Sequence, residues 1–235
     1  MVTPVEEVSA RAWLTGAPQG GVISPLLSNI YLHHLDREWD RHGTGVLVRY
    51  ADDAVVLCKS PAQTVAAEQR MQAILDSLHL GLNPAKTRRV DLREGREGFD
   101  FLGCHFHARV SGRLLEQGIG RYYLHRWPST AGMKRVRHKV KERTGHNRSG
   151  VRDIRVIIRE LNPVLRGWGN YFRTGNAAKK FNQVDHYVED RLQRLLRNRY
   201  GRNLRPRHWE TWTSDWFRDQ GLHRLRGTVR YPGAA

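Results

Sequence analysis

The chain has 235 residues, and its 40 lysines and arginines against 23 aspartates and glutamates give a formal net charge of +17. With 39% hydrophobic residues it can bury a core, so the composition excludes a disordered tail. The sequence has no apolar run of ~18 residues and no leader pattern after Met1, which argues against a membrane span and a secretory signal. The two cysteines, Cys58 and Cys104, are too few and too far apart for a disulfide framework or a zinc site. These features fit a cytoplasmic protein.

The first predicted elements are a helix and a hairpin. Ser24-Pro25 begins the helix, with serine as its cap and proline in its first turn, and apolar residues at helical spacing continue to a break at residues 42–45. Residues 46–50 and 54–58 are predicted strands. Residues 51–53 between them are few enough for a hairpin turn.

A second amphipathic helix is predicted to begin at Ser60-Pro61 and to close near Gly81. An extended piece is expected around Lys86-Thr87. Residues 99–110 are strand-like, and residues 111–115 are predicted to form a turn and a short return strand.

The rest of the chain is predicted to be helical. Residues 134–143 hold six basic side chains. Residues 152–173 and 177–200 each place apolar residues on one face, and the second carries arginines on the opposite face. Asn162-Pro163 interrupts the first of these helices, either as a kink or as the cap of a new helix.

The positive charge is confined to the same helical part. Residues 1–100 carry 11 basic and 13 acidic side chains, whereas residues 101–235 carry 29 and 10, with five of the seven tryptophans. Such a field suggests RNA, DNA or an anionic membrane surface, or simply a solvated exterior. Because the charge is mostly arginine interleaved with aromatic residues, we favour nucleic acid, since arginine pairs phosphates and stacks on bases.

Two adjacent carboxylates, Asp52 and Asp53, lie between the two apolar strands of the predicted hairpin. An ordinary exposed turn would explain them, since aspartate favours turns. Alternatively they bind metal, because Mg²⁺ takes oxygen ligands and a pair of ions can clamp both oxygens of a phosphoryl transfer. A hairpin would hold such ligands in place.

Neighbouring sequence blocks favour the metal interpretation. Tyr50-Ala51-Asp52-Asp53 resembles the signature of reverse transcriptases, and residues 18–32 (PQGGVISPLLSNIYL) resemble the block that precedes it. Residues 82–87 (LNPAKT) and 101–103 (FLG) resemble the next two blocks. Four blocks in the right order are specific to these polymerases, whereas any one alone is weak.

A further run resembles the maturase (X) region of group II intron-encoded proteins, namely residues 161–172 (LNPVLRGWGNYF). By itself this run also fits an amphipathic helix with core aromatic residues. The resemblance, which covers about residues 11–200, implies an α+β fold. It comprises a partial polymerase palm at 1–112, with an antiparallel sheet and packed helices, and a basic, all-α thumb/maturase domain at 113–235.

The resemblance also implies site residues. Asp52 and Asp53 would hold catalytic Mg²⁺, with Asp52 the main ligand. Two other candidates have ordinary alternatives: Gln19-Gly20-Gly21 would also fit a flexible turn, and Lys86 would also fit a solvated surface residue. The residues implied near template, primer end and incoming nucleotide are Gln19, Gly20, Tyr50, Ala51 and Lys86.

The implied partners are group II intron RNA, an RNA template with a DNA primer, and deoxynucleoside triphosphates, in a cytoplasmic ribonucleoprotein without membrane contact. Phosphate contacts would dominate affinity and make it salt dependent. The helical residues implied to contact RNA are Lys134, Arg135, Arg137, Lys139, Arg166, Trp168, Tyr171, Arg173, Arg194 and Arg197.

Departures from the family pattern set the expected activity. The sequence begins shortly before Pro18, and residues 1–17 offer only Glu6 and Glu7, in no context that matches the family's first catalytic aspartate. We therefore expect a C-terminal fragment with an incomplete ligand set and an exposed sheet edge, inactive alone and restored by an N-terminal polymerase half in trans. No endonuclease domain is expected after residue 200.

Two hypotheses remain open. The first is an RNA-directed DNA polymerase of a group II intron, present as a fragment. The second is an RNA-binding maturase module that assists splicing and makes no DNA, for which the hairpin aspartates are unnecessary. A basic DNA-binding protein with an accidental polymerase resemblance is a remote third.

Overall fold

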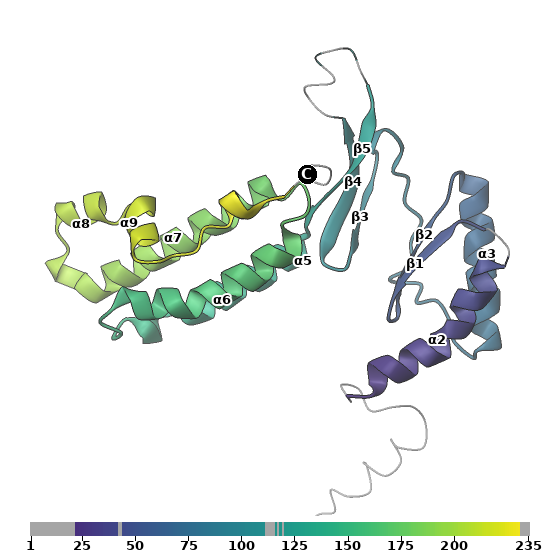
Figure 1. Cartoon of the computed structure of the whole chain (residues 1–235), viewed down its shortest axis with the longest axis horizontal. Coiled ribbons are helices and arrows are strands. Elements are labelled where there is room, and N and C mark those ends of the chain that lie inside the picture. The colour runs from purple at the N-terminus through teal and green to yellow at the C-terminus, as the bar shows by residue number, and fades with distance from the viewer. Residues whose placement is uncertain (1–21, 42–43, 111–115, 117, 119, 231–235) are drawn as a thin grey trace, which may run out of the picture. The chain divides into compact units, whose positions relative to one another are not determined.

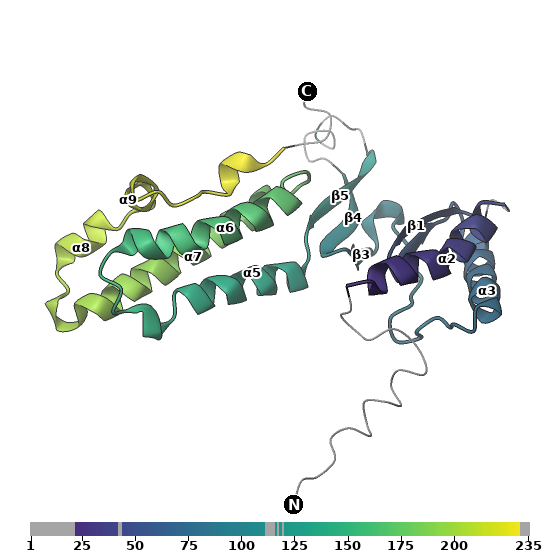
Figure 2. The same cartoon turned by 60° about the horizontal axis from the view of Figure 1, so that its bottom comes forward.

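The computed structural model describes residues 22–41, 44–110, 116, 118 and 120–230, shown in Figures 1 and 2. The chain divides into two compact units, Met1–Arg89 and Val90–Ala235. Helices dominate, and they accompany a two-stranded and a three-stranded antiparallel sheet. The predicted α+β class is confirmed. Among the described residues, no helix is both long and apolar enough to cross a membrane.

The N-terminal unit packs two helices with a β-hairpin. Helix α2 (Ser24–Asp40) and helix α3 (Pro61–Ser77) share a core with strands β1 (Val46–Tyr50) and β2 (Asp53–Leu57). These bounds confirm the predicted helices and hairpin. The buried residues of this core are Leu32, Leu35, Trp39, Ala67, Met71, Ile74 and Leu75.

Capping follows the prediction at one helix and departs from it at the other. The Ser60 hydroxyl accepts a hydrogen bond from Gln63 N at 3.2 Å, as expected for a cap. At α2 the prediction of a serine cap was wrong. Ser24 is the first helical residue, and Ile23, which occupies the cap position, makes no side-chain hydrogen bond there.

The prediction of an extended segment around Lys86-Thr87 was wrong, because Asn83 turns the chain there. The backbone N–H groups of Lys86 and Thr87 both donate to Asn83 O, at 3.1 and 2.8 Å. Asn83 Oδ1 also accepts from Ala85 N at 3.0 Å. Asparagine competes for local backbone donors in this way, which favours turns over strands.

The C-terminal unit begins with a sheet that the sequence revealed only in part. Strands β3 (Gly98–Phe101), β4 (Cys104–Val110) and β5 (Tyr122–Pro128) pair in that order. The single predicted strand at 99–110 is instead a hairpin, turned by Leu102 and Gly103 with φ of 48° and 74°. Return strand β5 was missed, and the return predicted within 111–115 lies outside the described residues.

Helices complete this unit around the larger core. Helix α5 (Thr130–Arg143) packs against α6 (Ile154–Phe172) and α7 (Ala178–Tyr200), and Figure 2 shows α8 (Pro206–Thr211) and α9 (Ser214–Asp219) following them. Helix α6 runs continuously through Pro163, so no new helix starts there. The fully buried residues of this core include Ile157, Leu161, Leu165, Phe181, Val184, Leu192, Phe217 and Leu225.

Candidate functional site

The hairpin of the N-terminal unit presents both predicted metal ligands to solvent. Tyr50 pairs with Asp53 across the hairpin, so Ala51 and Asp52 form its two-residue turn. Asp52 and Asp53 are exposed, as is the Tyr50 ring at 65%. The hairpin thus holds two adjacent carboxylates at its tip, which suits the oxygen chemistry of Mg²⁺.

The turn is strained and is held by an arginine that the sequence analysis missed. Ala51 has a φ of 54°, a conformation that glycine usually supplies at the first central position of such turns. Arg49 Nη1 donates to Ala51 O at 2.8 Å and to Asn29 Oδ1 at 3.2 Å, while Arg49 Nε donates to Asp36 Oδ1 at 2.8 Å. Arg49 therefore fixes the turn to helix α2.

The hairpin offers two candidate metal ligands, Asp52 and Asp53, and no third one joins them among the described residues. Across the part of the chain that the structure describes, no group of three or more His, Cys, Asp or Glu gathers so that it could hold a metal ion. Lys86 is exposed in its turn, and among the described residues no hydrogen bond or ion pair joins its side chain to either aspartate. Gln19 and Gly20 lie outside the described residues.

Helix α5 separates its basic residues from its apolar ones. Met133, Val136 and Val140 are buried in the core. The basic residues predicted to bind RNA lie between these positions and are all exposed: Lys134, Arg135, Arg137 and Lys139. Arg137 lies over the Tyr187 ring, with its guanidinium carbon 5.6 Å from the centroid.

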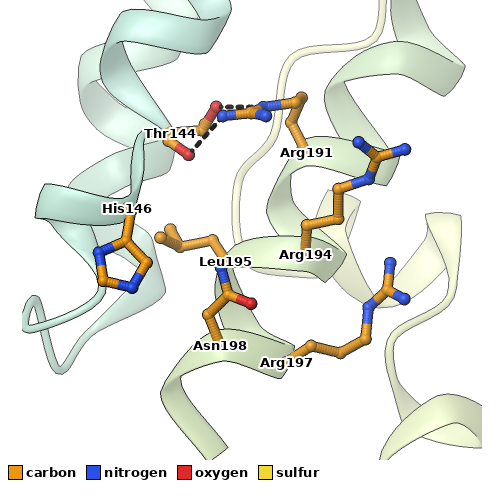
Figure 3. A pocket seen from close by; sticks show the side chains of 7 residues that line it. All are labelled: Thr144, His146, Arg191, Arg194, Leu195, Arg197 and Asn198. Carbon is orange, nitrogen blue, oxygen red and sulfur yellow. Dashed lines mark hydrogen bonds between the residues drawn. The ribbon is translucent and has the colours of Figure 1, made fainter. Parts of the chain in front are cut away.

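A cavity of about 500 Å³ opens between the end of α5 and helix α7 (Figure 3). Arg191, Arg194 and Arg197 follow one another along α7 at intervals of three residues. No aspartate or glutamate is found among the described residues that line it. The lining residues are Thr144, His146, Arg191, Arg194, Leu195, Arg197 and Asn198.

One wall of this cavity is fixed by hydrogen bonds. Arg191 Nε donates to Thr144 Oγ1 at 3.0 Å, and Arg191 Nη2 donates to Thr144 O at 2.8 Å. Thr144 Oγ1 in turn donates to Val140 O at 2.8 Å. This arginic cavity is a preformed concave site for a negatively charged group.

The residues of the maturase-like run have mixed surroundings. Trp168 is half-buried, with ring centroids 4.9 Å from Phe172 and 5.4 Å from Phe181, so core packing explains it and its RNA contact stays a prediction. Tyr171 is 58% exposed and donates its O–H to Leu102 O at 2.8 Å. Arg166 is exposed and Arg173 is half-buried.

Sequence reasoning missed the residues whose partners are distant in the chain. Arg49 reaches Asp36 across 13 positions, and Arg191 reaches Thr144 across 47. His146 carried no pattern that could have marked it. Arginines that recur along α7 did predict a basic face, but only the fold shows that this face borders a cavity.

Two family models match the chain. Residues 3–106 match "Reverse transcriptase (RNA-dependent DNA polymerase)", and residues 133–214 match "Group II intron, maturase-specific domain". The first match contains the aspartate hairpin, and the second contains the arginic cavity.

Two curated proteins are similar over part of their lengths. Protein YkfC of Escherichia coli is 33% identical over 143 residues, covering 46% of this chain and 36% of that protein. The "Uncharacterized 91 kDa protein in cob intron" of Schizosaccharomyces pombe is 25% identical over 258 residues, covering 78% of this chain and 31% of that protein. The chain spans about a third of the length of these relatives. With its two domain matches in order, the chain belongs to the group II intron reverse transcriptase/maturase family.

Proposed function

We propose that the chain binds group II intron RNA through its helical unit and assists splicing as a maturase. The observation that carries this proposal is the arginic cavity, whose described lining holds three arginines and a histidine without a carboxylate. Arginine pairs phosphate bidentately, and a concave site gathers adjacent phosphates of a folded strand. In this proposal residues 113–235 form the RNA-binding domain and residues 1–112 form the partial palm.

The exposed basic face of α5 supports the same function. Four cationic side chains on one helix would add phosphate contacts outside the cavity. Each contact releases a counterion, so binding should weaken steeply as salt rises. A basic surface that served only solubility would not require a cavity whose described lining lacks carboxylates.

The experiment measures binding of a structured intron RNA to the full chain across a salt series. We expect Arg194→Ala to lower affinity at every salt concentration and to reduce the salt slope by about one unit. Arg218→Ala is the matched control, because it removes the same charge from an exposed ion pair with Asp215. Binding that is insensitive to salt, or an equal loss in both variants, would contradict the proposal.

A second function, RNA-directed DNA polymerisation, is favoured by the hairpin aspartates and the reverse-transcriptase match. In it Asp52 and Asp53 would hold Mg²⁺, which supplies charge stabilisation during nucleotidyl transfer from a deoxynucleoside triphosphate. Tyr50 and Ala51 would lie beside the primer end on an RNA template. Because two carboxylates alone make an incomplete site, we propose that further ligands come from another polypeptide segment.

Exposed apolar side chains on the N-terminal unit support such a partner, a polymerase half that binds in trans. They lie at the start of helix α2, along this helix and on the hairpin, and a monomer leaves few such large apolar groups in water. These residues are Ile23, Leu26, Leu27, Ile30, Tyr31, Val46, Val48, Tyr50 and Leu57, each 43% to 65% exposed.

Primer extension with Mg²⁺ on an RNA template tests this second function. We expect no extension by the chain alone and extension after an N-terminal polymerase half is added. Asp52→Asn should abolish the restored activity, whereas Asp40→Asn, which removes an exposed charge at the end of α2, should leave it intact. Robust extension by the chain alone would refute the need for a partner.

A further inference from the structure

One face of the sheet β3–β4–β5 collects rings and arginines. Residues paired across antiparallel strands share a face, as do alternate residues along each strand. The register therefore places three rows on this face: Asp100, His105 and Trp127; Gly98, His107 and His125; Arg109 and Tyr123. We call this face the imidazole–indole platform.

The rings of the platform lie against one another. The His105 and Trp127 centroids are 5.1 Å apart, and His107 lies 6.1 Å from His105 and 6.2 Å from Trp127. The guanidinium carbon of Arg109 lies 4.6 Å from the Trp127 centroid. This arrangement is a continuous array of flat groups with a cation above the indole.

A glycine makes the array possible. A Cβ placed on Gly98 would lie 2.6 Å from His105 Nε2 and 2.9 Å from His107 Cδ2, closer than real atoms come. The imidazoles thus occupy the space that a side chain on β3 would fill. The rings of His105 and His107 therefore pack directly against the β3 backbone at Gly98.

The platform does not belong to the hydrophobic cores of the described residues. Cys104, on the opposite face of β4, packs against the larger core, whereas neither core cluster contains a ring of the platform. The Tyr123 side chain is 42% exposed, and Arg109 is exposed. The platform is therefore open to solvent at Tyr123 and Arg109, while His105, His107, His125 and Trp127 are half-buried beside them.

We propose that the imidazole–indole platform binds unpaired bases of a single-stranded nucleic acid by stacking. Stacking on aromatic rings and guanidinium planes is how proteins hold single strands without reading their sequence. Arg109 and Arg121, whose guanidinium carbon is 5.8 Å from the Tyr123 centroid, supply charge for the flanking phosphates. The inference rests on the proposed nucleic-acid function, but it assigns base contacts to a sheet rather than phosphate contacts to helices.

Charge on the platform suits this ligand. Burial, with Arg109 and His107 nearby, lowers the pKa of His125, so its ring is neutral at neutral pH and stacks without a second charge. The one carboxylate, Asp100, is 2.6 Å from His105 Nδ1 and is occupied by it. Metal binding is the weaker explanation, since the described residues contain no group of three metal-ligating side chains.

Two adjacent tyrosines provide a matched test. Tyr123 lies on the platform and Tyr122 on the opposite face, and they are 42% and 45% exposed. Binding of the full chain to unstructured oligonucleotides of about 12 nucleotides is measured by fluorescence anisotropy, with RNA, DNA and abasic forms. We expect Tyr123→Leu to weaken binding of the base-containing strands about 5- to 150-fold and Tyr122→Leu to change it less than about 2-fold.

The abasic strand separates this inference from the proposed function. It retains the phosphates, so Tyr123→Leu should leave its binding unchanged, while Arg194→Ala should still weaken it. If abasic and base-containing strands bind equally well and salt dependence persists, the platform is refuted and the proposed function stands. If neither strand nor structured RNA binds, the proposed function fails as well.

Two further results complete the test. RNA and DNA strands should lose affinity alike, because stacking reads base faces and not the 2′-hydroxyl; a loss confined to one of them would overturn stacking. Trp127→Leu should reproduce the Tyr123→Leu effect in a chain whose thermal unfolding confirms that it is folded. Equal losses in Tyr122→Leu and Tyr123→Leu would also overturn the proposal.

Discussion

Arg49 and Asp36 form a two-pronged ion pair that joins strand β1 to helix α2. Arg49 Nε donates to Asp36 Oδ1 at 2.8 Å, and Nη2 donates to Oδ2 of the same carboxylate. The third nitrogen reaches Ala51 O, one residue before Asp52. The direction in which the hairpin presents its carboxylates is therefore set by a helix outside the hairpin.

Arg49→Lys should loosen the hairpin without removing its charge. Lysine cannot make the paired hydrogen bonds and the contact with Ala51 at once, so we expect a loss of about 1–3 kcal/mol in unfolding free energy and faster hydrogen exchange in β1 and β2. The matched control is Arg41→Lys, whose partner Glu38 forms an exposed pair; a change below about 0.5 kcal/mol is expected there. Equal effects in the two variants would contradict the positioning role of Arg49.

Ala51→Gly should relieve the strain in the turn. At a φ of 54° glycine has no Cβ penalty, so we expect the unfolding free energy to rise by up to about 1 kcal/mol. Ala54→Gly, in strand β2, serves as the control and should lower it by about 0.5–1 kcal/mol. Urea unfolding of both variants measures the difference, and a loss of stability in Ala51→Gly would show that the turn is unstrained.

Two glycines of α6 give opposite predictions. A Cβ on Gly169 would lie 2.7 Å from Leu225 Cδ2, a fully buried side chain, whereas Gly167 has nothing within 4 Å. We expect Gly169→Ala to destabilise the helical unit by about 1–3 kcal/mol through overpacking. Gly167→Ala should stabilise it by about 0.5–1 kcal/mol through helix propensity. Thermal unfolding that changes in the same direction for both would refute this packing argument.

Asp185→Ala should release the segment that follows α9. The Asp185 carboxylate accepts from Leu225 N at 2.9 Å and from Arg226 N at 3.0 Å. Removing it leaves these donors without their acceptor, so a loss of about 1–3 kcal/mol is expected. Hydrogen exchange at residues 225–226 reports the release directly, and unchanged protection there would count against it.

The same carboxylate gives a pH dependence. Burial raises the pKa of Asp185, so the folded state holds this proton more tightly than the unfolded state. Its contribution to stability is then largest in acid and falls as pH rises through the folded pKa. Asp185→Asn, which carries no such charge, should therefore gain stability relative to the native chain as the pH rises from the ordinary aspartate pKa of about 4 through the raised pKa of the folded state. Parallel unfolding curves across that range would contradict the shift.

Local signals predicted the elements that local chemistry determines. Two apolar, β-branched runs on either side of two aspartates were enough to predict β1, β2 and the hairpin between them, and Ser60-Pro61 was enough for the start of α3. Strand β5 was missed because its apolar and polar residues do not alternate: Tyr122, Tyr123 and Leu124 are consecutive, as are His125 and Arg126, so the pattern that marks a half-buried strand is lacking. The hairpin at Leu102-Gly103 was missed because leucine rarely takes positive φ.

The sequence predicted some parts of the candidate sites and not others. The exposed hairpin tip was predictable because aspartate favours turns, although the turn is one residue shorter than predicted: Asp52 lies in it and Asp53 begins β2. The arginic cavity did not, because it depends on the approach of α7 to the end of α5, which no stretch of sequence encodes by itself. The imidazole–indole platform likewise required the register that brings His125 opposite His107.

The bond between Arg191 and Thr144 has an electrostatic consequence for the arginic cavity. Thr144 is the residue that ends helix α5, and the carbonyl end of a helix carries the negative pole of its dipole. Left bare, that pole would repel a phosphate from the same hollow that the arginines make attractive. By binding the Thr144 carbonyl and hydroxyl, Arg191 neutralises the pole, so the attraction exerted by Arg194 and Arg197 is not cancelled from the opposite wall.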